Sequence, residues 1–129
     1  MTYLLVGIGG ALGAMARHAV NHVVHQHLLS ARFPWGIFAI NVAGSFVIGV
    51  LGGLLASERV VWGYPLRTFI IVGILGGFTT FSSFSFDTLA LSREGLQAQA
   101  LLNVVGQVGL SLLVVWIGYG LGFRAPASP

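Results

Sequence analysis

The chain has 129 residues, of which 56% are hydrophobic and 7% are charged, and its mean hydropathy is +0.91. Soluble globular proteins carry about 25% charged residues, so this composition excludes a soluble domain. The six arginines are scattered, which argues against nucleic-acid binding, and the lack of cysteine excludes disulfides and thiolate chemistry.

Four apolar stretches are long enough to cross a bilayer, which takes about 20 mostly apolar residues. Arg17 lies in the first stretch and Asp87 in the third, whereas the second and the fourth are uncharged. Because only short turn-forming segments separate them, we predict an all-α membrane protein with one four-helix domain over residues 1–129 and both termini on one side. The predicted spans are residues 3–25, 35–56, 68–91 and 96–122.

The arginines are divided almost evenly between the two sides of the predicted bundle. Cytoplasmic loops normally hold an excess of Lys and Arg, so an even division permits insertion in both orientations and an antiparallel pair of copies. A fixed topology with a weak signal is the alternative. One side holds Arg59, Arg67 and Arg124, and the other holds Arg32 and Arg93, with Arg17 near that interface.

Small residues recur at spacings typical of close helix contact in membranes. Such faces indicate packing, and their number in so short a chain favours an oligomer, with a homodimer as the first choice. The pairs are Gly9 with Gly13, Gly118 with Gly122, and Ser45 with Gly49.

The third span is unusually polar for a membrane anchor. Gly76 and Gly77 favour a break in the helix, and hydroxyl residues follow directly. A broken helix inside a membrane offers carbonyls to a cation and N–H groups to an anion. A tightly packed, unbroken Gly/Ser helix is the alternative that these residues leave open.

Phe81 and Phe84 lie three residues apart, on nearly one face of a helix. Aromatic ring edges are positively polarised, so the pair can favour an anion, and the hydroxyls of Ser82, Ser83 and Ser85 can donate hydrogen bonds beside it. Simple packing of the two rings is the alternative.

Other polar residues lie within the remaining spans. Asn41 offers an amide donor to an anion or to a carbonyl. Asn103, Gln107 and Ser111 form a stripe spaced by four residues. Arg17 either extends to the interface or places positive charge at a pore mouth.

Catalytic patterns are lacking, so an enzyme is not expected. No paired carboxylates, H-E-x-x-H or G-x-S-x-G occur in the chain. His18, His22 and His25 share one helical face, a spacing that could mimic a metal site. Because no carboxylate or cysteine lies nearby, we expect them to line the watery end of the first span instead.

Together these residues resemble the Fluc (CrcB) family of fluoride channels, and the resemblance covers the whole chain. The strongest part is Gly76–Ser85, which is similar to the family's third-helix signature. Residues 13–17 and 36–46 resemble the motifs of the first and second helices. Three motifs in the same order and at matching depths make the resemblance specific.

The resemblance implies an antiparallel, dual-topology homodimer in the cell membrane, with a third helix broken near Gly76–Thr79. It implies two fluoride pores and a structural sodium ion on the backbone carbonyls of Gly76 and Thr79 from both copies. The pore residues that it implies are Asn41, Phe81, Phe84, Ser82, Ser83, Ser85, Gln107 and Ser111, with Arg17 and Asp87 in the vestibule.

Two positions depart from the family pattern. Gln107 stands where a small hydroxyl residue is usual, and Asp87 stands where glutamate is usual.

The expected function is passive, selective fluoride efflux. A small multidrug-type proton-coupled exporter is the alternative, although it requires a carboxylate deep in the first span, and a non-transporting membrane scaffold is a third class.

Overall fold

The computed structural model describes residues 1–28 and 32–124, and all regular structure within them is helical. Four stretches are long and apolar enough to cross a membrane, which confirms the prediction of four spans. The third begins at Tyr64, four residues before its predicted start, because Pro65 lies in its first turn, where its missing N–H costs little. The elements are α1 (Thr2–His27), α2 (Trp35–Ala56), α3 (Tyr64–Arg67), η1 (Thr68–Leu75), α4 (Gly76–Phe78), α5 (Phe81–Arg93) and α6 (Gln97–Phe123).

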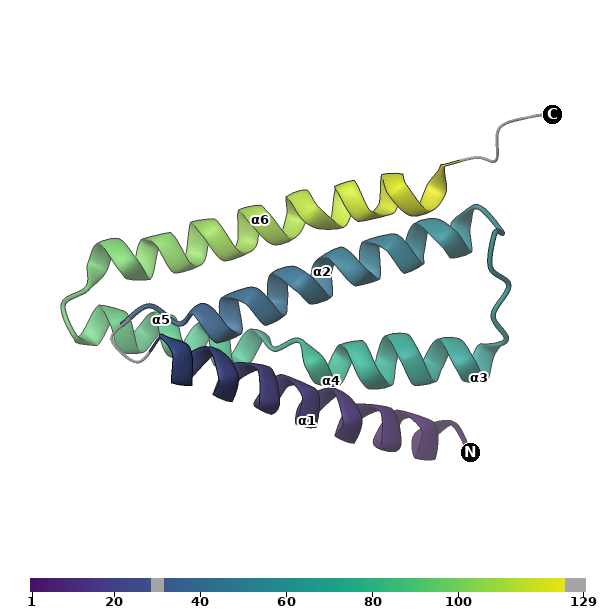
Figure 1. Cartoon of the computed structure of the whole chain (residues 1–129), viewed down its shortest axis with the longest axis horizontal. Coiled ribbons are helices and arrows are strands. Elements are labelled where there is room, and N and C mark those ends of the chain that lie inside the picture. Colours follow the sequence, from purple (N-terminus) through teal and green to yellow (C-terminus); the bar gives the residue numbers. More distant parts are fainter. Residues whose placement is uncertain (29–31, 125–129) are drawn as a thin grey trace.

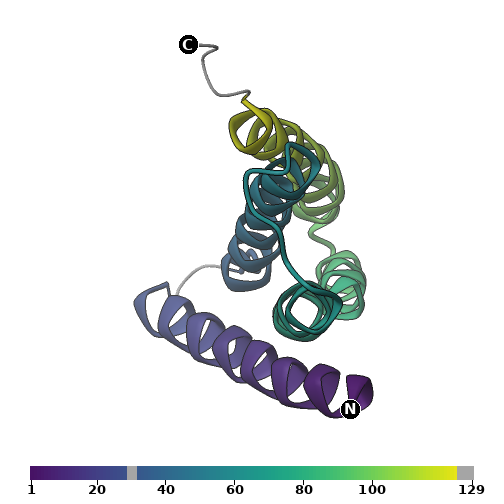
Figure 2. The same cartoon turned by 90° about the vertical axis from the view of Figure 1, so that its right-hand side faces the viewer.

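The helices form two packed pairs. α2 lies along α6, whereas α1 lies along η1 and α4 and stays away from α6 (Figures 1 and 2). The start of α1 and the end of α6 lie at the same end of the bundle (Figure 1). This arrangement places α5 and the first half of α2 close to the first half of α6.

The third span is made of segments with different backbone conformations. η1 is a π-helix, α4 is a short α-helical turn, and α5 begins anew at Phe81. Between α4 and α5, Thr79 and Thr80 have extended backbones, with ψ of 156° and 119°. The interruption therefore falls near the middle of the span.

The glycine motifs are used for contacts within the chain. A Cβ on Gly9 would lie 2.7 Å from the Phe69 carbonyl oxygen and 2.9 Å from the Gly73 Cα. A Cβ on Gly118 would lie 2.5 Å from the Phe46 carbonyl oxygen. The small-residue faces thus bring α1 to η1 and α6 to α2, so the glycine spacing is not an argument for an oligomer.

A three-residue turn sets α6 against α5. Gly95 has a φ of +79°, and the Leu96 N–H donates to the Leu91 carbonyl at 2.9 Å. Glycine adopts this left-handed conformation without steric cost, as is usual after the end of a helix. The short turn makes the two helices antiparallel neighbours and brings Thr88 of α5 opposite Asn103 of α6.

Most large apolar side chains lie on the outside of the bundle, as a membrane environment requires. Ile37, Ile40 and Phe84 form the buried cluster, with Phe78 packed against it. By contrast, large residues such as Leu101 and Trp116 are exposed along α6.

The helix contact through Gly9 generates a stability prediction. Gly9→Ala is expected to lower the free energy of unfolding by about 1–3 kcal/mol, because the new methyl group overlaps the backbone of η1. Gly7→Ala is the matched control, since a Cβ there meets nothing within 4 Å. Thermal unfolding of both variants in detergent measures the difference, and equal melting temperatures would contradict the contact.

Candidate functional site

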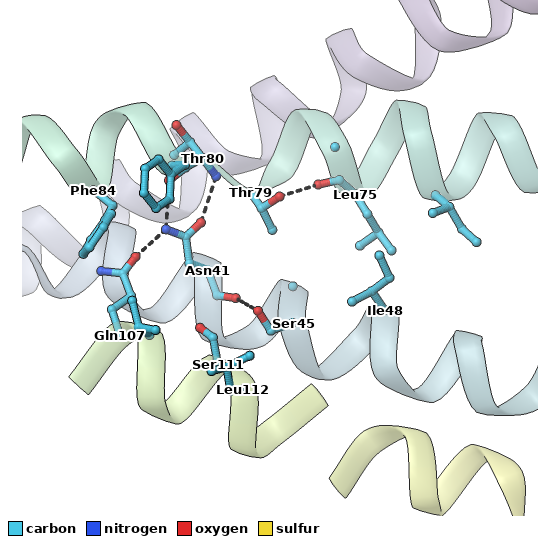
Figure 3. A pocket seen from close by; sticks show the side chains of 15 residues that line it. Asn41, Ser45, Ile48, Leu75, Thr79, Thr80, Phe84, Gln107, Ser111 and Leu112 are labelled. Carbon is cyan, nitrogen blue, oxygen red and sulfur yellow. Dashed lines mark hydrogen bonds between the residues drawn. The ribbon is translucent and has the colours of Figure 1, made fainter. Parts of the chain in front are cut away.

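A cavity of about 590 Å³ lies between α2, α6 and the interruption of the third span. Its wall combines apolar side chains with neutral polar groups (Figure 3). The lining residues are Asn41, Gly44, Ser45, Ile48, Ile71, Leu75, Gly76, Thr79, Thr80, Phe81, Phe84, Gln107, Val108, Ser111 and Leu112. No Asp, Glu, Lys or Arg occurs among them.

Asn41 joins α2 to the interruption. Its Oδ1 accepts the Thr80 N–H at 2.8 Å, and its Nδ2 donates to the Thr80 carbonyl at 2.9 Å. One side chain thereby satisfies both backbone groups of the residue at which the helix is interrupted. In a bilayer, where water does not replace these bonds, such a partner is required.

The amide of Asn41 continues into α6. Its Nδ2 also donates to Gln107 Oε1, and Gln107 Nε2 donates to Asn103 Oδ1 at 3.1 Å. Asn103 in turn donates from Nδ2 to Thr88 Oγ1 at 2.9 Å. Asn103 is fully buried and Gln107 is 4% exposed.

Phe81 and Phe84 have unequal environments. Their ring centroids lie 5.2 Å apart with the planes inclined by 53°. Phe84 is 7% exposed and packs in the buried cluster, whereas Phe81 is 76% exposed. Both rings reach the cavity, so an aromatic wall begins where α5 begins.

The hydroxyl groups of the third span surround the start of α5. Thr80 Oγ1 accepts the Ser83 N–H at 3.2 Å, as the N-cap residue of the helix, and lies 3.1 Å from Ser82 Oγ. Ser85 donates to the Phe81 carbonyl at 2.9 Å on an exposed face. Ser82, Ser83 and Ser85 do not line the cavity.

The two charged residues of the predicted spans, Arg17 and Asp87, lie outside the cavity wall. Arg17 is half-buried on α1, and Asp87 is half-buried on α5. They form no ion pair with each other, and within residues 1–28 and 32–124 the Asp87 Oδ2 atom is buried without a hydrogen-bond partner.

The histidines of α1 form no ligand set. The rings of His18 and His22 stack at 6.3 Å, and among the described residues no three His, Cys, Asp or Glu side chains gather where a metal could bind.

The structure therefore brings together the part of the predicted site that lies at the interruption. Asn41, Phe81, Phe84, Gln107 and Ser111 share one cavity with Gly76 and Thr79. Sequence reasoning noted Asn103 only as part of a polar stripe and missed Thr88. The available signal for Thr88 was a hydroxyl residue four positions after Phe84, which marks a side chain able to bond back to the helix.

Four apolar spans, three of which enclose a neutral, polar cavity at a helix interruption, define the class, which is a multi-pass protein of the cell membrane. Residues 4–119 match the family described as CrcB-like protein, Camphor Resistance (CrcB), and the chain belongs to that family.

Relatives support this assignment over nearly the whole chain. The chain is 48% identical to a protein of Opitutus terrae over 118 residues, which cover 91% of this chain and 89% of the relative. It is 48% identical to a protein of Paramagnetospirillum magneticum, covering 92% and 93%, and 45% identical to one of Thermus thermophilus, covering 93% and 94%. Each of the three bears the name fluoride-specific ion channel FluC.

The hydrogen bonds of Asn41 generate a second stability prediction. Asn41→Leu is expected to lower the free energy of unfolding by about 2–4 kcal/mol, because it leaves the backbone of Thr80 and Gln107 Oε1 without their partner. Ser45→Ala removes only a bond from the Ser45 hydroxyl to the Asn41 carbonyl within α2 and is expected to cost less than about 1 kcal/mol. Denaturation monitored by circular dichroism measures both, and similar losses would contradict the role of Asn41.

Proposed function

We propose that the chain is a fluoride-selective ion channel that lets cytoplasmic fluoride leave the cell passively and so reduces its toxicity. The observation that carries the proposal is the cavity at the interruption, where neutral donors and phenylalanine rings meet in the middle of a span. The names of the relatives, which are 45–48% identical over more than nine-tenths of this chain, give the ion.

Neutral groups suit an anion that must enter and leave quickly. Amide and hydroxyl donors with positively polarised ring edges replace part of the hydration of fluoride without a full charge that would trap it. Hydrogen fluoride crosses membranes as a neutral acid and ionises in the cytoplasm, so the negative-inside potential is sufficient to drive the anion out. The channel then needs no proton-coupling carboxylate.

Each predicted pore residue has a place in this proposal. Phe81, Phe84, Gln107 and Ser111 line the path, and Asn41 joins it to the helix interruption. Ser82, Ser83 and Ser85 add hydroxyls along α5 beyond the cavity. Arg17 and Asp87 shape the electrostatic potential at the vestibule, where Asp87 is one methylene shorter than the glutamate that is usual at this position.

A second, antiparallel copy completes the pore in this proposal. Phe81 reaches the cavity while 76% exposed, which leaves much of one ring available to a partner. The even division of the arginines over the two sides supports an opposite orientation of that partner.

The backbone at the interruption fits a structural sodium ion between the copies. In a continuous α-helix the Thr80 N–H would donate to the Gly76 carbonyl, and the Ser83 N–H would donate to the Thr79 carbonyl. Here Asn41 Oδ1 and Thr80 Oγ1 accept these two N–H groups. Both carbonyls are thereby released from their helical donors, and carbonyl oxygens are suitable ligands for a hard cation.

A proton-coupled exporter is less well supported. Such an exporter requires a carboxylate deep in the first span, and α1 contains neither Asp nor Glu. The names of the relatives do not favour it either.

The proposed pore predicts a specific pattern of ion flux. In liposomes containing the protein, fluoride is expected to leave at least about tenfold faster than chloride. This ratio corresponds to about 1.4 kcal/mol of discrimination between the two anions. Phe81→Ala and Phe84→Ala are each expected to reduce fluoride flux by a similar factor. Ion-selective electrodes measure both anions, with Tyr3→Phe as a control at the exposed start of α1.

Two results would contradict this proposal. Equal chloride and fluoride flux would exclude selectivity. Normal fluoride flux in both phenylalanine variants would exclude the assigned path even if the protein conducts.

The sodium site predicts a cation-dependent stability. At a sodium concentration about 100 times its dissociation constant, binding is expected to stabilise the dimer by roughly 2.7 kcal/mol relative to a buffer of N-methylglucamine. Thermal unfolding in detergent with the two cations, and with potassium as a control, measures the effect. Identical melting temperatures in all three would exclude a sodium ion on the Gly76 and Thr79 carbonyls.

A further inference from the structure

Three amide side chains form one hydrogen-bonded row that connects the helix interruption to Thr88. Asn41 donates to Gln107, Gln107 to Asn103 at 3.1 Å, and Asn103 to Thr88 at 2.9 Å. We call these four side chains the amide row. Every bond in the row points in the same direction, from α2 through α6 to α5.

The direction of the row is fixed at its α5 end. The Thr88 hydroxyl has one proton, which it donates to the Phe84 carbonyl at 2.8 Å. Towards Asn103 the same oxygen is therefore only an acceptor. Asn103 must present Nδ2 to Thr88 and Oδ1 to Gln107, and Gln107 must then present Oε1 to Asn41.

The direction is fixed independently at the other end. The Thr80 N–H only donates and the Thr80 carbonyl only accepts, so Asn41 must place Oδ1 at the N–H and Nδ2 at the carbonyl. This orientation is also the one that Gln107 Oε1 requires. A reversed Asn41 amide would oppose like groups at Thr80 and at Gln107, so the two ends enforce one arrangement.

The row commits both protons of Asn41 Nδ2, one to Thr80 and one to Gln107. Gln107 uses one proton of Nε2 on Asn103, and no acceptor among residues 1–28 and 32–124 takes the other. Figure 3 shows this nitrogen on the side of Gln107 that faces Phe84, away from Asn41. The hydrogen bonds of the row therefore leave one proton of Gln107 Nε2, and none of Asn41 Nδ2, to the cavity.

We propose that Thr88 and Asn103 are positioning residues for the anion path, a role that rests on the proposed function. Neither side chain lines the cavity, and Asn103 is fully buried. Acting through Gln107, they reinforce the orientation in which Asn41 binds the extended backbone of Thr80, and they leave Gln107, in place of Asn41, to offer an amide proton to the anion.

The test compares Thr88→Val with Thr88→Ser. Valine keeps the shape and removes the hydroxyl, whereas serine keeps the hydroxyl. For valine we expect about a tenfold loss of fluoride flux and about a tenfold faster hydrogen exchange of the Thr80 amide, as for one lost buried hydrogen bond. For serine we expect both values within about twofold of the wild type.

The control is Ser57→Ala. The Ser57 hydroxyl also bonds back to a helix carbonyl, that of Gly53 at 2.9 Å, but it lies outside the row. Its loss is expected to leave flux and Thr80 exchange unchanged. If Thr88→Val does not yield a monodisperse protein on size exclusion, Asn103→Leu tests the next link with the same expected losses.

The outcomes separate this proposal from the proposed function. If Thr88→Val retains wild-type flux and wild-type protection of Thr80, or loses flux with Thr80 still protected, the positioning role is overturned. If the wild type itself passes no fluoride, the proposed function fails, and Thr80 exchange alone decides: faster exchange in the valine variant supports the row, and unchanged exchange overturns it.

Discussion

The two hydrogen bonds between Asn41 and the backbone of Thr80 are the constraint on which the rest of the site depends. A helix interrupted at membrane depth exposes N–H and carbonyl groups that neither lipid nor distant water can satisfy. A carboxamide has the same donor and acceptor groups as a peptide unit, so a single asparagine replaces the missing helical partners without introducing charge. Because the bonds keep Thr80 extended, α5 begins at Phe81, and both phenylalanines reach the cavity.

The glycines allow this interaction by bringing the backbones together. A Cβ on Gly44 would overlap Thr79 Cγ2, so a larger residue there would require the Thr79 side chain to move away from α2. Gly44 follows Asn41 by three residues and shares its helical face, which places the amide opposite Thr80. On the other side, a Cβ on Gly77 would lie 2.9 Å from the Gly10 Cα, which fixes α4 against α1. The interruption thus lies between two close helix contacts, one with α2 and one with α1.

The sequence predicts the four spans and the interrupted segment better than it predicts which residues contact them. Apolar length identifies the four spans, and the residues from Gly76 to Ser85 mark an unusual segment, since both signals are local. The partners of Asn41 lie 39 and 66 residues away, and no local pattern specifies them. By the family resemblance, Gln107 takes the place of a small hydroxyl residue, and its longer side chain bonds to both Asn41 and Asn103. The glycine spacing predicts close helix contacts, but only the fold determines that these contacts lie within the chain.

In the proposed channel, neutral groups line the path of the anion, so the cavity wall needs no charged residue. A full positive charge in the cavity would bind an anion strongly and release it slowly, whereas dipoles bind it weakly enough to pass. Dipoles, however, must be oriented to be effective, because a side-chain amide that turns over presents its oxygen in place of its protons. In this chain the fixed donor of Thr80 and the committed hydroxyl of Thr88 set that orientation from both ends. In the proposed function, selectivity for an anion follows from the direction of these hydrogen bonds, because the charged residues Arg17 and Asp87 lie outside the cavity wall.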